Sequence, residues 1–125
     1  MHQLSRDELK MLMQRQTGYC VSLYMPTYQA GADVQQNAIR CKNLLREAEA
    51  RLLATGLRTS EVHTWLEPIQ QLVVDNAFWQ QQNAGLALFC DAEIFRAYCL
   101  PLTFAELVVV AERFHLKPLL PLFTS

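Results

Sequence analysis

The chain has 125 residues, of which 51% are hydrophobic and 18% are charged, and its formal net charge is −1. This length fits a single globular domain that builds its core without disulfides or a structural metal. The near-balance of charge excludes binding to nucleic acid through a general excess of positive charge. The charge is nevertheless uneven: residues 5–58 carry eight basic and five acidic side chains, whereas residues 59–125 carry three and seven.

Compartment is predicted from hydropathy and cysteine usage. No apolar run approaches the roughly eighteen residues of a membrane span, and the chain starts without the basic and apolar regions of a secretion signal. The four cysteines are widely separated and form no C-x-x-C pair; they are Cys20, Cys41, Cys90 and Cys99. We therefore expect free thiols, a cytoplasmic location and no membrane contact.

The first predicted element is a helix with a clear start signal. Ser5 is the expected N-cap, and Glu8 three residues later completes a capping box. Leu4 and Leu9 flank this box as a hydrophobic staple, and Gly18 is expected to stop the helix. An apolar stripe along one side indicates that the helix packs against another element.

A strand, a loop and a long helix follow. Residues 19–25 are rich in strand-forming side chains and end at Pro26, so they predict a buried strand. Residues 26–34 contain proline, glycine and aspartate without periodicity, which is typical of an exposed loop. Residues 35–54 repeat apolar side chains at spacings of three and four, and they predict an amphipathic helix that Gly56 ends.

Two further helices are expected between residues 59 and 82. The first begins after Thr59 and Ser60, and Pro68 within it predicts a kink or a break. Asp75 is the expected cap of a second, short helix that runs through Gln82.

The last third of the chain changes to the two-residue period of strands. We expect strands at residues 85–89, 94–100 and 107–112, with Asp91 in a turn and a short helix near 116–123. The valine run of the third strand is typical of a strand covered on both faces. The order α-β-α-α-α-β-β-β-α predicts an α+β domain with one mixed or antiparallel sheet of about four strands and helices packed on it.

Catalytic motifs are missing from the sequence. It contains no G-x-G-x-x-G, P-loop, H-E-x-x-H or G-x-S-x-G motif, and its histidines have no ligand-like spacing. We expect His63 at the surface and His115 packed at a strand-to-helix junction. The expectation is a protein that is not an enzyme and that has no cofactor and no metal site.

The candidate functional residues lie in the 26–34 loop and at the start of the long helix. Basic, aromatic and amide side chains beside a helix start can hold a phosphate backbone or stack on a base; here they are Tyr28, Asn37, Arg40, Lys42 and Arg46. The alternative is that the charges only solvate the outer face of an amphipathic helix. A second aromatic group is expected to belong to the core; it comprises Trp65, Phe78 and Trp79.

Four segments in order resemble the N-terminal domain of the bacterial archaeo-eukaryotic release factor family. They are residues 18–26 (GYCVSLYMP), 40–49 (RCKNLLREAE), 83–89 (NAGLALF) and 114–120 (FHLKPLL). That family is similar to the class 1 peptide-chain release factor and to its ribosome-rescue relative Pelota. The resemblance covers nearly the whole chain and implies that residues 1–125 are the N-terminal domain of a longer protein.

The family motifs for codon reading are altered in this sequence. The Asn-Ile-Lys-Ser motif best matches residues 37–41, with an inserted alanine and no serine. The Tyr-x-Cys-x-x-x-Phe motif falls on Val108, Val110 and Phe114 and keeps only its phenylalanine. The chain has no Gly-Gly, so the Gly-Gly-Gln motif that triggers peptidyl-tRNA hydrolysis is absent. The resemblance thus implies a recognition domain rather than a hydrolytic one.

Two functions follow as expectations. The first is a non-catalytic, translation-associated domain that contacts the ribosome, ribosomal RNA or messenger RNA, beside other domains of the same protein. The local excess of positive charge over residues 34–58, five basic against two acidic, supplies the attraction. The alternative is a protein-interaction or dimerisation module without a nucleic-acid role, based on the apolar 65–79 region; light scattering across concentration would reveal such a homodimer.

Overall fold

The computed structural model describes residues 3–29 and 33–124. The elements in chain order are α1 (Arg6–Gln14), β1 (Cys20–Pro26), α2 (Asp33–Ala54), α3 (Thr59–Val73), α4 (Asn76–Trp79), β2 (Gly85–Cys90), β3 (Phe95–Leu100), β4 (Leu107–Ala111) and the 3₁₀ helix η1 (Lys117–Leu122). The predicted order and the predicted α+β class are confirmed.

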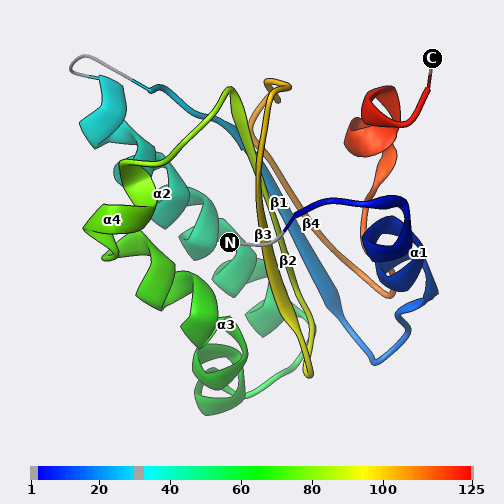
Figure 1. The fold of residues 1–125 in the computed structure, drawn as a ribbon. Coiled ribbons are helices and arrows are strands. Elements are labelled where there is room, and N and C mark those ends of the chain that lie inside the picture. Colours follow the sequence, from blue (N-terminus) through cyan, green and yellow to red (C-terminus); the bar gives the residue numbers. More distant parts are fainter. Residues whose placement is uncertain (1–2, 30–32, 125) are drawn as a thin grey trace.

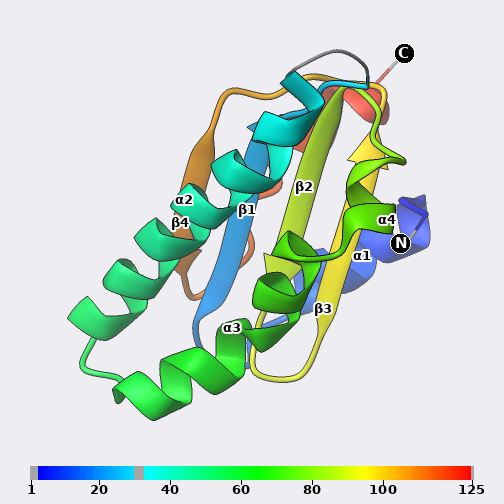
Figure 2. The same ribbon diagram turned by 90° about the vertical axis from the view of Figure 1, so that its left-hand side faces the viewer.

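One four-stranded sheet forms the centre of the molecule. Its strand order is β3-β2-β1-β4, and all three pairings are antiparallel. Helices α2, α3 and α4 cover one face, whereas α1 and η1 lie on the other (Figure 1). Viewed from the helical side, α2 runs over β1 and β4, and α3 with α4 runs over β2 and β3 (Figure 2).

Alternation along β1 divides the buried side chains into two cores, because successive side chains of a strand point to opposite faces. Val21, Leu23 and Met25 face the α2–α4 layer. Cys20 and Tyr24 face α1 and η1 and join a second core. Since β1 is buried along nearly its whole length, its near-continuous apolar sequence is explained by cover on both faces.

Helix α1 starts as predicted but ends earlier. The Ser5 side chain accepts a hydrogen bond from the Glu8 backbone N–H at 3.1 Å. The Glu8 carboxylate does not complete the capping box; it accepts from the Tyr98 hydroxyl at 2.8 Å and from Arg96 at 3.2 Å, and so ties α1 to β3. The helix stops at Gln14, and Gly18 serves the following turn, where its φ of 111° favours glycine.

Three sequence expectations are corrected by the structure. Helix α3 is continuous through Pro68, so the break that was one of the two expected outcomes does not occur; Leu66 and Ile69 on either side of it are both fully buried in the core. Helix α4 ends at Trp79 rather than Gln82. Strand β4 is an edge strand in which only Val108 is fully buried, so its valine run does not mark cover on both faces.

The described residues contain no membrane-spanning helix and no disulfide. Within residues 3–29 and 33–124, no helix is long and apolar enough to cross a bilayer. All four cysteines are free, as predicted.

Candidate functional site

The predicted site begins with an amide that joins the end of β1 to α2. Asn37 is completely buried, and its Nδ2 donates to the Tyr28 carbonyl oxygen at 2.9 Å. The Tyr28 backbone N–H donates to Asn37 Oδ1 at 3.2 Å. Both backbone polar groups of Tyr28 are therefore held by one side chain, and Asn37 positions the loop instead of facing a ligand.

Arg40 lies one helical turn beyond Asn37 and stacks on Tyr28. Its Cζ is 5.0 Å from the centre of the Tyr28 ring, which is within the range of a cation–π contact. The Tyr28 side chain is still 40% exposed. The Nη1 atom of Arg40 is buried and has no hydrogen-bond partner in the described part of the chain. The pair thus presents an accessible ring backed by a cation with unused donor capacity.

Lys42 and Arg46 do not join this pair. An α-helix turns about 100° per residue, so Lys42 lies about 160° around the helix from Arg40. Lys42 and Arg46 are four residues apart and share the exposed side of α2. Ile39, which is half exposed, lies on the same side. The structure therefore brings Tyr28, Asn37 and Arg40 together and places Lys42 and Arg46 on an adjacent surface.

The basic residues of α2 differ in whether they are neutralised. Among the described residues, Arg40, Lys42 and Arg46 take part in no ion pair. Arg51 pairs with Glu47 at 3.0 Å, and its Nη1 donates to the Val108 carbonyl of β4 at 2.6 Å. The positive charge counted from the sequence is thus partly used by the fold, and three cations of α2 have no ion-pair partner in the described part of the chain.

Replacing Asn37 by alanine tests the loop anchor. We expect Asn37→Ala to lower the free energy of unfolding by about 1–2 kcal/mol, because two buried hydrogen bonds are lost and no new partner is at hand. Urea unfolding followed by circular dichroism measures the loss. Exposed Asn43→Ala on the same helix is the control and is expected to stay within about 0.5 kcal/mol of wild type. Equal effects of the two changes would contradict the anchoring role.

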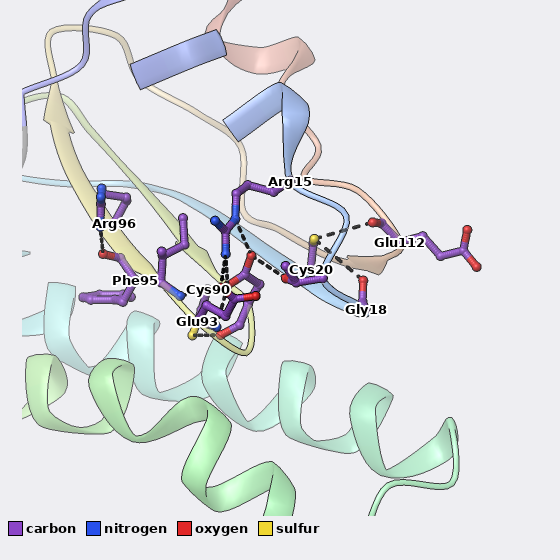
Figure 3. A network of polar contacts seen from close by, with 11 residues as sticks. Arg15, Gly18, Cys20, Cys90, Glu93, Phe95, Arg96 and Glu112 are labelled. Carbon is purple, nitrogen blue, oxygen red and sulfur yellow. Dashed lines mark hydrogen bonds and ion pairs between the residues drawn. The ribbon is translucent and has the colours of Figure 1, made fainter. Parts of the chain in front are cut away.

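A second polar cluster was not foreseen from the sequence. The Asp91 carboxylate, at the end of β2, accepts from Arg15 Nε at 2.9 Å and from the Thr17 hydroxyl at 2.8 Å. It also accepts from the backbone N–H groups of Glu93 and Ile94, both at 2.8 Å. Figure 3 shows Arg15 reaching down to the turn that contains Glu93. These contacts join the segment after α1 to the β2–β3 turn, so the cluster stabilises the fold.

The buried thiols provide no nucleophile. Burial raises the pKa of Cys20 to about 11 and the pKa values of Cys41 and Cys90 to about 12. A thiol with such a pKa is protonated at neutral pH and unreactive. Nor do the described residues bring together three His, Cys, Asp or Glu side chains that could hold a metal ion.

The remaining sequence candidates are found where they were expected. Phe78 and Trp79, which belong to α4, are buried in the core, and Trp65 is half buried. His63 is exposed and lies 3.0 Å from Glu49. The His115 backbone N–H donates to Ser22 Oγ at 2.8 Å, so this residue packs at the junction after β4. The apolar 65–79 region is thus largely occupied by the domain's own core.

The two motif regions of the release-factor resemblance lie in different surroundings. In the 37–41 segment, Arg40 stacks on Tyr28, whereas the exposed Ile39 lies on the Lys42–Arg46 side of α2. Val108 packs under α2, whereas Phe114 belongs to the core on the opposite face. The chain matches no protein-family model and no curated protein, so the resemblance stays a prediction.

Proposed function

We propose that this chain is a non-catalytic recognition domain of a translation-associated, release-factor-like protein and that it binds RNA at the start of α2. The observation that carries the proposal is the exposed Tyr28 ring stacked on Arg40, which forms no ion pair with a described residue. An aromatic ring with a neighbouring guanidinium is a recurrent platform for an unstacked base. Ribosomal or messenger RNA is the expected partner.

Lys42 and Arg46 extend the proposed contact around α2. Neither cation is paired with a carboxylate in the described structure, so both are available to phosphate oxygens. Arg40 and the Lys42–Arg46 pair lie on different sides of the helix, as the helical period requires. The nucleotide that stacks on Tyr28 and the phosphates that meet Lys42 and Arg46 would therefore belong to separate parts of one RNA strand or fold.

Removal of the three cations tests this interface. We expect Arg40→Ala with Lys42→Ala and Arg46→Ala to weaken binding of a fluorescein-labelled single-stranded RNA about tenfold or more in low salt. Each cation that contacts a phosphate contributes about 0.7 to the slope of log K against log salt, so the loss of Lys42 and Arg46 should lower the slope by about 1.4. Fluorescence anisotropy across a salt series measures both quantities.

The matched control removes three cations elsewhere. Lys10, Arg58 and Lys117 are exposed and lie on or beside other elements, so replacing all three by alanine changes net charge equally. Equal loss of RNA affinity in both triple variants would reduce the interaction to bulk charge and contradict the site. Comparison of Tyr28→Ala with Tyr28→Phe separates the contribution of ring stacking from that of the hydroxyl group. Ribosome co-sedimentation of the same variants repeats the measurement with intact ribosomes.

A further inference from the structure

A cavity of about 650 Å³ opens between α3 and the turn that joins β2 to β3. Its volume lies in the range of small-molecule sites, roughly 300–1,000 Å³. The β2–β3 turn is at the opposite end of the sheet from the start of α2 (Figure 2). The cavity is therefore separate from the proposed RNA contact, and the function proposed above does not use it.

The walls of this cavity are mainly apolar and aromatic. Trp65 and Pro68 contribute from α3, and Ile94 and Phe95 contribute from the turn and from β3. Figure 3 shows Cys90 and Phe95 directed from their strands toward the helical layer. The Cys90 thiol donates to the Trp65 carbonyl oxygen at 3.2 Å, so strand and helix are fixed to each other at the cavity wall.

Three carboxylates line the cavity. Asp91 is fully used by contacts within the protein, whereas Glu61 and Glu93 can still accept hydrogen bonds. Asp91 is fully buried and is satisfied by Arg15, Thr17 and the turn backbone. Glu93 is 62% exposed and lies 3.6 Å from Arg15, which already pairs more closely with Asp91. Glu61 is half exposed, with an exposed Arg58 at 3.9 Å. Among the described residues that line the cavity, none is a lysine, arginine or histidine.

The indole of Trp65 is incompletely satisfied. Its Nε1 atom is buried and has no hydrogen-bond partner in residues 3–29 and 33–124. By contrast, Trp79 Nε1 donates to the carbonyl oxygens of Leu72 and Val73, both at 3.0 Å. Buried indole N–H groups normally find an acceptor, so the hydrogen bonding of Trp65 is less complete than that of Trp79.

We propose that this cavity binds a small organic cation with a flat amidinium or guanidinium group. Aromatic rings attract a cation, and the cavity is lined by two aromatic residues, Trp65 and Phe95. Planar N–H donors match carboxylates in charge-assisted hydrogen bonds, and Glu61 and Glu93 have the capacity to accept them. The flat apolar part of the ligand packs beside Pro68 and Ile94.

Benzamidine and its neutral counterpart benzamide test the proposal, because the two have nearly the same shape and differ in charge. The chain has two tryptophans, so a ¹H–¹⁵N spectrum contains two indole signals, and Trp65→Phe identifies that of Trp65. We expect benzamidine to shift the Trp65 signal saturably, with a dissociation constant below about 1 mM, and to leave the Trp79 signal in place. Benzamide is expected to bind at least tenfold more weakly.

Carboxylate variants complete the test. Glu61→Gln with Glu93→Gln should weaken benzamidine binding at least tenfold, since both charges at the cavity are removed. Glu67→Gln with Glu106→Gln removes two exposed carboxylates that do not line the cavity and should leave binding unchanged. Equal binding of benzamidine and benzamide, an unshifted Trp65 signal, or equal loss in the two double variants would each overturn the proposal. So would stronger binding of an arginine-containing peptide, which would make the occupant a protein.

Discussion

Asp91→Ala is expected to destabilise the domain by about 3–5 kcal/mol, which is the usual cost of removing one partner of a buried ion pair. The Asp91 side chain is fully buried, and that of Arg15 is only 20% exposed, so the change leaves Arg15 with only the longer contact to the exposed Glu93. The N–H groups of Glu93 and Ile94 lose their acceptor as well. Because domains are typically stable by 5–15 kcal/mol, this loss is a large share of the total.

Urea unfolding monitored by circular dichroism measures the effect. Glu93→Gln is the matched control, because it removes the longer and exposed contact of the same arginine and should cost less than about 1 kcal/mol. Asp91→Asn keeps the shape of the side chain but not its charge, and is expected to fall between the two. If Asp91→Ala and Glu93→Gln unfolded at the same urea concentration, the cluster would not be the structural link described above.

The pH dependence of the same variants gives an independent check. Burial alone would raise the pKa of the Asp91 carboxyl, but hydrogen bonds from Arg15, the turn backbone and Thr17 outweigh it and hold the pKa below its usual value. A depressed pKa means that this contribution is complete above the unfolded value of about 3.9 and is lost as pH falls through the lower folded value. The stability difference between wild type and Asp91→Asn should therefore be constant near neutral pH and shrink in acid.

Gly85→Ala is expected to cost about 3 kcal/mol or more, at the upper end of the overpacking range. A Cβ atom added at Gly85 would collide with the Leu102 carbonyl oxygen and would lie 2.6 Å from Phe104 Cδ2. The residue cannot move away easily, because it pairs with Pro26 of β1 on one side and with Leu100 of β3 on the other. Phe104 is itself buried in the second core.

Gly56→Ala provides the contrast for this prediction. A Cβ at Gly56 meets nothing within 4 Å, but the φ of 96° is unfavourable for alanine, so the cost is conformational and about 1 kcal/mol. Thermal or urea unfolding of both variants separates steric exclusion from backbone preference. A Gly85→Ala variant no less stable than Gly56→Ala would show that residues 102–104 shift readily, and would contradict the tight crossing described here.

Local signals in the sequence were sufficient for the element order. Ser5 and Asp75 were recognised as caps from their neighbours, and each side chain accepts the expected backbone N–H. The three-and-four spacing in 35–54 identified the buried side of α2, which contains Cys41, Leu45 and Leu52. These features depend on residues within about one helical turn of each other, so they can be predicted from the local sequence.

Features made by distant parts of the chain could not be predicted in this way. Asp91 and Arg15 are 76 residues apart, and nothing in either neighbourhood indicates the other. Gly85 was read as the start of a strand, whereas its requirement for glycine comes from the later crossing of residues 102–104. Similarly, the hydrogen bond from Arg51 to the Val108 carbonyl oxygen joins α2 to a strand 57 residues further along the chain.

The candidate site contains one feature that the sequence does not reveal and one that it does. That Asn37 is buried and holds Tyr28 depends on how the loop returns to the helix, which the sequence does not reveal. The separation of Arg40 from Lys42, by contrast, follows from the helical period alone. Grouping Tyr28, Asn37, Arg40, Lys42 and Arg46 as one surface overlooked that period, and the site is better described as a stacked pair beside a basic helix face.

The contact between Arg51 and β4 also affects how the sheet ends. Strand β4 is an edge strand rich in valine, and such edges readily accept a strand from another molecule, which leads to aggregation. Arg51 occupies the Val108 carbonyl with its Nη1 atom, and a charged side chain from α2 therefore lies at this edge. An incoming strand would have to displace this guanidinium before it could pair with the Val108 carbonyl.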